Sequence, residues 1–127
     1  MRVRFDWGQY ITLARELSCC SQSDPLIEAK HRSSISRAYY SVFVPAYNYL
    51  RRKQRKYSPK GKGTHEFVID EFTNSMDQTQ QLIGIQLNQL RECRNNADYE
   101  DDVPQLSHFV GLALGLADDT AKLLKRL

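Results

Sequence analysis

The segment with the clearest chemical potential runs from Arg94 to Tyr99 and reads Arg-Asn-Asn-Ala-Asp-Tyr. A guanidinium stays charged and presents a planar fork of donors, which suits a phosphate or a pentavalent phosphorane. Arg94 is therefore the first candidate for contact with a phosphate group. The alternative is structural, because Arg94 and Asp98 are four residues apart and would form an ion pair if one helix carries both.

A histidine and a tyrosine supply further candidate groups. We expect His65 in the first turn of a helix, where the cationic form is disfavoured, so that a neutral imidazole can act as a base. Capping or packing is its alternative role. The phenol of Tyr99, with a pKa of ~10, is a poor general base at neutral pH. Tyr99 can still donate a hydrogen bond to phosphate, stack on a base, or pack in the core or an interface.

Cations in the first half of the chain are candidates for binding. Arg37 lies on a helix with an aromatic stripe, where it either contacts substrate or forms a buried ion pair, with Asp98 as a candidate partner. Arg51, Arg52 and Lys53 open a run of basic residues that contains no acid. Such a run attracts phosphate, but it is also typical of a solvated helix end. Residues 1–62 hold 13 Lys/Arg against 4 Asp/Glu, and residues 63–127 hold 5 against 11, so the basic excess is confined to the first half.

Helices must position these groups, since no segment shows the alternating pattern of a strand. Apolar residues recur at three- and four-residue steps in five segments, at about 5–20, 25–56, 65–74, 77–96 and 104–127. The loops between them are short, which favours antiparallel neighbours. The sequence therefore predicts an all-α, up-and-down bundle of about five helices, and residues 1–127 are expected to form a single domain.

Individual residues refine this prediction. Asp24 is expected to cap the second helix, with Pro25 at its first position, and Thr64 to cap the third. Pro45 lies inside the second helix and removes one backbone hydrogen bond, so a kink is expected there. The expected core positions of the fourth helix are apolar residues of its first half and centre: Leu82, Ile83, Leu87 and Leu90.

Composition favours a cytoplasmic protein without a metal or other cofactor. No long apolar stretch follows the basic residues at the N-terminus, so no signal peptide is expected, and no apolar run approaches the ~20 residues that span a bilayer. Cys19, Cys20 and Cys93 are odd in number and include an adjacent pair, so they do not make a disulfide framework. Together with three scattered histidines they also lack zinc spacing. We expect reduced thiols and no membrane association.

Three stretches of the chain carry a recognisable combination of motifs: residues 28–43, which contain Arg37-Ala38-Tyr39-Tyr40, residues 63–69, which open with Gly-Thr-His-Glu, and residues 90–99, which end in Ala-Asp-Tyr. In this combination the chain resembles the HEPN family. The resemblance implies a helical bundle that often forms a homodimer. Many members are metal-independent ribonucleases, and many are toxins that act beside a minimal nucleotidyltransferase or another antitoxin. The resemblance therefore implies RNA as a target and such a protein as a partner.

The family's active motif is an Arg, usually followed by a polar residue, with a His a few residues further on. Arg94 and Asn95 match its beginning, but Tyr99 and acidic residues stand where the His is expected. The chain is thus similar to the branch of the family that carries Ala-Asp-Tyr at this place. If this chain cuts RNA, the implied reaction is attack of the ribose 2′-hydroxyl on the adjacent phosphate. Arg94 would stabilise charge, Asn95 and Tyr99 would orient the phosphate, and His65 is the only evident base.

The alternative is a non-catalytic HEPN module. It would bind a nucleotidyltransferase partner, a nucleotide or RNA, and Arg94, Asp98 and Tyr99 would then form a structural polar cluster. The missing His favours this alternative, whereas the Arg-Asn pair and the basic run favour the ribonuclease.

Overall fold

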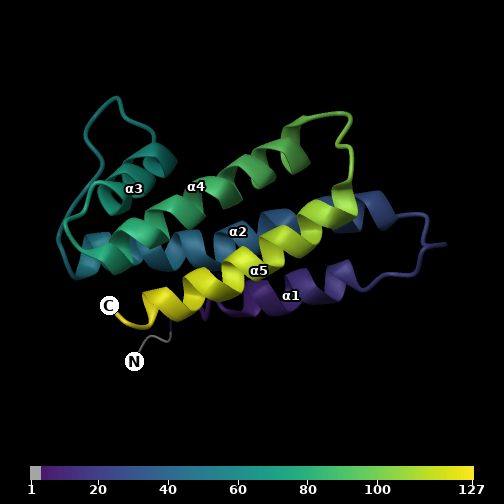
Figure 1. Ribbon diagram of the computed structural model, residues 1–127, viewed down its shortest axis with the longest axis horizontal. Coiled ribbons are helices and arrows are strands. Elements are labelled where there is room, and N and C mark those ends of the chain that lie inside the picture. The colour runs from purple at the N-terminus through teal and green to yellow at the C-terminus, as the bar shows by residue number, and fades with distance from the viewer. Residues whose placement is uncertain (1–3) are drawn as a thin grey trace.

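The computed structural model describes residues 4–127 and places five α-helices in this part of the chain (Figure 1). No strand occurs among the described residues. The helices, in chain order, are α1 (Gln9–Ser18), α2 (Ile27–Arg52), α3 (Thr64–Thr73), α4 (Gln78–Tyr99) and α5 (Leu106–Leu124).

Four of the helices, α1, α2, α4 and α5, run alternately up and down, and the short α3 fills the connection between α2 and α4 (Figure 1). The central helix is α2, which contacts each of the other four. All five contribute to one apolar core, for example through Ala14, Ile35, Val68, Ile83 and Ala113. The predicted all-α bundle is confirmed.

The long second helix is continuous through Pro45, so this residue does not split it in two. Its C-terminal end comes earlier than predicted, at Arg52 instead of about Lys56. The reason is local, because Arg55 adopts a left-handed backbone with φ of 52°, which turns the chain away from the helix axis.

The expected N-caps of α2 and α3 are wrong in detail. Asp24 accepts a hydrogen bond from the Leu26 amide at 2.8 Å, and therefore closes the turn that precedes Ile27, the first residue of α2. Thr64 is itself the first residue of α3, and the extended residue before it is Gly63. No side chain caps the N-terminus of either helix.

The fourth helix continues beyond its predicted end at about Asn96 and reaches Tyr99. Arg32 of α2 explains the extension, because its guanidinium donates hydrogen bonds to three carbonyls at the end of α4. Nη1 bonds to the Ala97 oxygen at 3.0 Å and the Glu100 oxygen at 2.5 Å, and Nη2 bonds to the Asp101 oxygen at 2.9 Å. These carbonyls lack partners within the helix. The extension puts the whole Arg94–Tyr99 segment on one helix.

The core face of α4 differs from the prediction at one position. Ile83, Leu87 and Leu90 are fully buried, but Leu82 is 42% exposed. The buried stripe continues through Arg94 and Ala97, and Leu82 lies about 100° around the helix from Ile83.

Two further findings concern the state of the cysteines and the length of the apolar helices. The three cysteines are free thiols, with Cys93 buried in α4 and Cys19 exposed. Within residues 4–127, no helix combines the length and apolar character needed to cross a membrane.

Candidate anion-binding site

Arg94 lies at the centre of the candidate site, with its side chain only 8% exposed. Its guanidinium carbon is 5.5 Å from the ring centre of Tyr39, 5.7 Å from that of Tyr40 and 5.6 Å from that of Tyr99. Aromatic faces at this distance attract a cation. The helix face that α4 turns toward α2 therefore holds a buried positive charge in an aromatic surround.

Asp98 is the ion-pair partner of Arg94, as the four-residue spacing predicts. Nη1 of Arg94 lies 3.6 Å from Oδ2 of Asp98 and 3.4 Å from the hydroxyl of Tyr99. Both distances are long for a charge-assisted bond. Moreover, Nε of Arg94 is buried and has no acceptor among the described residues. The ion pair thus leaves part of the hydrogen-bonding capacity of Arg94 unused.

His65 belongs to the same cluster, although 29 residues separate it from Arg94 in the sequence. Its ring stacks on Phe43 at 4.3 Å between centroids and lies 5.6 Å from the ring of Tyr39. Burial, followed by the nearby Arg94 and Arg91, lowers the pKa of His65 to about 4. The imidazole is therefore neutral at physiological pH, as predicted, but desolvation is the main cause rather than its place in the helix.

The hydrogen bond between Tyr39 and His65 fixes the tautomer. The Tyr39 hydroxyl lies 2.6 Å from Nδ1 of His65, and this is its single hydrogen-bond partner in the described chain. Burial also raises the pKa of Tyr39 well above its usual value, so the phenol keeps its proton. A buried hydroxyl without another acceptor must donate to Nδ1. The proton of neutral His65 is then on Nε2, which makes this nitrogen a donor instead of a base.

Arg91 completes the cluster and was missed by the sequence analysis. It lies three residues before Arg94, on the same face of α4, and it is close enough to depress the pKa of His65. Its Nε is buried and without an acceptor, like that of Arg94, and no carboxylate among residues 4–127 forms an ion pair with Arg91. The three-residue spacing of Arg91 and Arg94 could have revealed it, because this spacing places both side chains on one face of a helix. We call Arg91, Arg94, His65 and Tyr99 the anion site.

Of the two residues predicted to orient a phosphate, Tyr99 joins the anion site at its exposed edge, whereas Asn95 does not join it. Tyr99 is 71% exposed, which excludes packing in the core of this chain. Asn95 is half-buried, but its side chain makes no hydrogen bond with any described residue. It lies about 100° around α4 from Arg94, so the structure does not bring it to the same face.

Arg37 makes no ion pair with Asp98. Instead, Oγ of Ser36 lies 3.4 Å from Oδ2 of Asp98, and Nη2 of Arg37 lies 3.4 Å from the same Oγ. The guanidinium of Arg37 is placed over aromatic rings, at 4.8 Å from Tyr10 and 5.3 Å from Tyr40. Arg37 is thus a second cation beside the anion site, linked to it through the ring of Tyr40.

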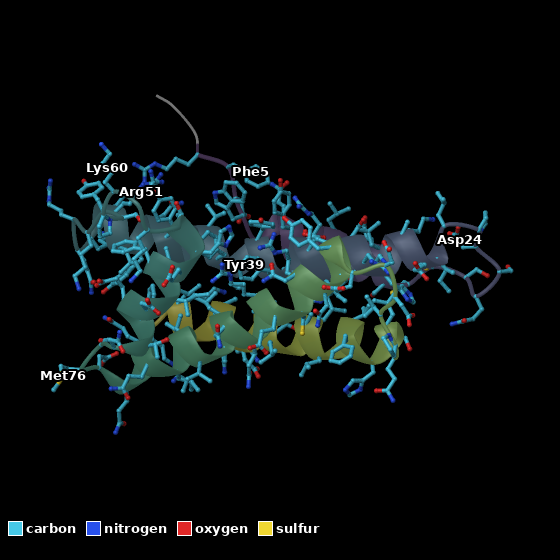
Figure 2. The ribbon with its side chains drawn as sticks, turned by 90° about the horizontal axis from the view of Figure 1, so that it is seen from above. Phe5, Asp24, Tyr39, Arg51, Lys60 and Met76 are labelled. Atoms are coloured by element: carbon cyan, nitrogen blue, oxygen red, sulfur yellow. The ribbon has the colours of Figure 1, made fainter. Side chains whose placement is uncertain are left out.

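The predicted basic run forms a separate surface. Arg51 and Lys60 lie at one end of the bundle, whereas Tyr39 lies near its middle (Figure 2). Lys56 and Lys62 of the run pair with Glu71 and Asp70 of α3, at 3.0 and 2.8 Å. Arg51 stacks on Tyr47 at 4.3 Å, while Arg52 and Lys53 are exposed. Part of this run is therefore neutralised by α3.

The described residues contain no group of three or more His, Cys, Asp or Glu side chains placed so that they could hold a metal ion. Comparison of the chain with family models, with curated proteins and with solved structures gives no match. The HEPN resemblance therefore rests on the sequence motifs alone and stays a prediction.

Proposed function

We propose that this chain is a HEPN-like protein that binds RNA, with a backbone phosphate held at the anion site. The observation that carries the proposal is the pair of arginines on one face of α4: Arg91 has no ion-pair partner among the described residues, and the ion pair of Arg94 is long. The Nε atoms of both are buried without an acceptor, a feature that they share with Arg32 and Arg51. A buried donor without a partner costs free energy, of the order of 1–3 kcal/mol. An anionic ligand would offset this cost, and the Nε2–H of His65 and the Tyr99 hydroxyl add further donors.

A second candidate is the metal-independent ribonuclease that the resemblance implies. The observation in its favour is that His65 and Arg94 both pack against Tyr39. In this reaction, the ribose 2′-oxygen would lose its proton to a base and attack the adjacent phosphorus, and the bond to the 5′-oxygen of the next nucleotide would break, so that this oxygen leaves with a proton and a 2′,3′-cyclic phosphate remains. Arg94 would stabilise the charge that develops on the phosphate. The tautomer of His65 favours binding over catalysis, because a base at Nε2 would require loss of the proton that the bond from Tyr39 places there.

The remaining expectations on assembly rest on the resemblance. A homodimer and an antitoxin or nucleotidyltransferase partner are part of the proposal only to the extent that this chain follows the HEPN family. The exposed ring of Tyr99, next to a buried arginine, is a surface on which either a partner or an RNA base can pack.

Binding of a fluorescein-labelled single-stranded RNA, followed by anisotropy, tests the proposal. Arg91→Gln removes one charge from the anion site without breaking an ion pair, and we expect it to weaken binding about tenfold or more. The slope of affinity against salt concentration should also fall by roughly one phosphate contact. The matched control is Arg15→Gln, which removes an exposed arginine of α1 that pairs with Asp118.

Equal affinities of the Arg91→Gln and Arg15→Gln proteins would overturn the binding proposal. Incubation of the same RNA with the wild type, without metal, tests the second candidate. Cleavage by the wild type at saturating RNA concentration that is lost in His65→Asn would establish the ribonuclease. If the RNA is bound but stays intact, the ribonuclease is contradicted and the RNA-binding function remains.

A further inference from the structure

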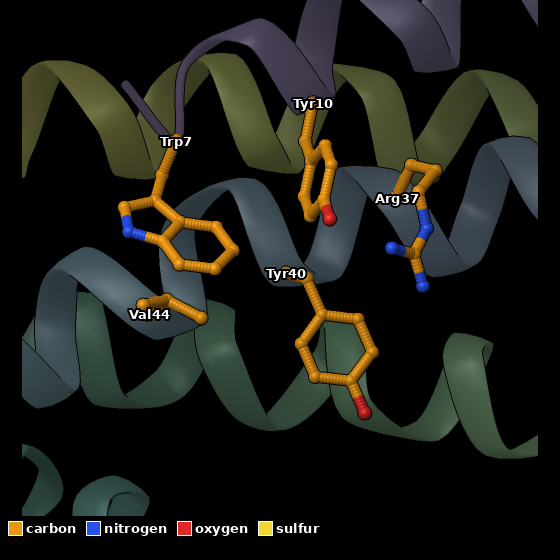
Figure 3. A pocket seen from close by; sticks show the side chains of 5 residues that line it. All are labelled: Trp7, Tyr10, Arg37, Tyr40 and Val44. Atoms are coloured by element: carbon orange, nitrogen blue, oxygen red, sulfur yellow. The ribbon is translucent and has the colours of Figure 1, made fainter. Parts of the chain in front are cut away.

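A hollow of about 400 Å³ opens between the start of α1 and the middle of α2 (Figure 3). Trp7, just before α1, and Tyr10 of α1 line it on one side, and Arg37, Tyr40 and Val44 line it from α2. Three of these five side chains are aromatic and one is a cation. The hollow is distinct from the anion site, but Tyr40 borders both.

The aromatic rings of the hollow hold each other in place. Trp7 and Tyr10 meet edge to face, with centroids 5.4 Å apart and planes at 78°, and the ring of Phe5 lies 4.9 and 5.5 Å from those of Trp7 and Tyr10. Rings fixed in this way offer a stacking surface whose order is already established before a ligand binds. A planar ring system such as a nucleobase has the shape and chemistry for this surface.

Arg37 gives the hollow its charge. Its guanidinium lies over Tyr10 and Tyr40, and its one hydrogen bond among the described residues is the long one to Ser36. No carboxylate in residues 4–127 is within ion-pair distance of it. The rings accept no conventional hydrogen bond, so most donors of the guanidinium are left for an anion. A charge that is half-buried and uncompensated calls for a negatively charged ligand.

We propose that this hollow is a nucleotide subsite, in which a base stacks on Trp7 and the phosphate of the same nucleotide bonds to Arg37. The subsite deepens the RNA-binding function proposed above and rests on it. The ring of Tyr40 lies 5.3 Å from the Arg37 guanidinium and 5.7 Å from that of Arg94, so a strand that binds both arginines would cross this ring. Stacking on Trp7 requires a base that is free of pairing, so the ligand is single-stranded.

Trp7 is the only tryptophan of the chain, so its fluorescence reports on the hollow directly. We expect AMP to quench it in a saturable titration, and adenosine and ribose 5-phosphate, which lack the phosphate and the base respectively, to bind at least about tenfold more weakly. Arg37→Gln should weaken AMP binding by a similar factor, and Arg15→Gln should not. Arg37→Lys, which keeps the charge but loses the planar fork, should fall between them.

The outcomes separate the subsite from the RNA-binding function. Saturable quenching by AMP that depends on Arg37 supports the subsite, even if RNA does not bind and the proposed function fails. RNA affinity that falls in Arg91→Gln, while AMP leaves Trp7 unquenched, overturns the subsite and keeps the function. AMP binding that is equal in the wild type and in folded Arg37→Gln or Arg37→Lys, as judged by circular dichroism, also overturns it.

Discussion

Replacement of Gly84 by alanine should loosen the attachment of α3 to the bundle. Gly84 lies in the buried face of α4, and a Cβ atom built there would be 2.5 Å from both the amide nitrogen and Oγ1 of Thr73, and 2.8 Å from its Cα. Carbon atoms in contact are ordinarily about 3.5–4.0 Å apart. Because two of these three atoms are backbone, no rotamer change relieves the clash, and α3 must move by about 1 Å.

The magnitude follows from two opposed effects. Overpacking that forces a backbone shift costs about 1–3 kcal/mol, whereas Gly→Ala inside a helix gains up to about 1 kcal/mol. We expect Gly84→Ala to be destabilised by about 1–2 kcal/mol. Gly115→Ala in α5 is the matched control, because a Cβ there meets nothing within 4 Å, and it should be stabilised by up to about 1 kcal/mol.

Thermal unfolding followed by circular dichroism measures both variants. In a domain of this size, about 1 kcal/mol corresponds to roughly 3–5 °C in Tm. Gly84→Ala should melt below the wild type and Gly115→Ala at or above it. A Gly84→Ala protein that melts at or above the wild-type temperature would refute the close approach of α3 and α4. It would also remove the support for the position of His65, which α3 carries.

Three further outcomes are expected. Arg32→Ala removes the donor to the Ala97, Glu100 and Asp101 carbonyls and should lower the free energy of unfolding in urea by about 1–2 kcal/mol, against less than about 1 kcal/mol for the exposed Arg15→Ala. Since the pKa of His65 is 6.5 in the unfolded chain and about 4 in the folded one, the unfolded state binds more protons between these values, so stability is lost as the pH falls through this window. His65→Asn keeps an acceptor for the buried phenol and does not titrate, so it should lose less stability than the wild type on going from neutral pH to about 4.5. Light scattering at micromolar concentration should give the mass of a dimer if the HEPN resemblance extends to assembly, and a monomer mass would contradict this.

The sequence predicted the helices well, because their apolar periodicity is a local signal. The C-terminal extension of α4 escaped it, since its cause is Arg32, more than 60 residues away in the chain. The Arg94–Asp98 pair was accessible from spacing, but the placement of His65 against Tyr39 was not. That contact depends on how α3 packs beside α2, and the residues of either helix alone do not determine this packing.

The hollow escaped the sequence analysis for a related reason. Trp7 and Tyr10 read as part of an apolar helix face, and Arg37 as a candidate for an ion pair. Only the packing of α1 on α2 brings their rings and the guanidinium together. Burial of Arg94 could not be predicted either, because an arginine on a core-facing stripe is rare and depends on the aromatic rings that happen to surround it.

The contrast between α2 and α3 has a consequence for the native-state fluctuations of this bundle. The amides of α2, which every other helix covers, should exchange with deuterium only on global unfolding. The short α3 is anchored mainly on α4, and it should open at a lower free energy as a local unit. Each such opening would withdraw the imidazole of His65 and expose the hydroxyl of Tyr39 to water. The anion site would then alternate between a state that contains the imidazole of His65 and a state that lacks it. This exchange would occur on the time scale of hydrogen exchange and without unfolding of the other four helices.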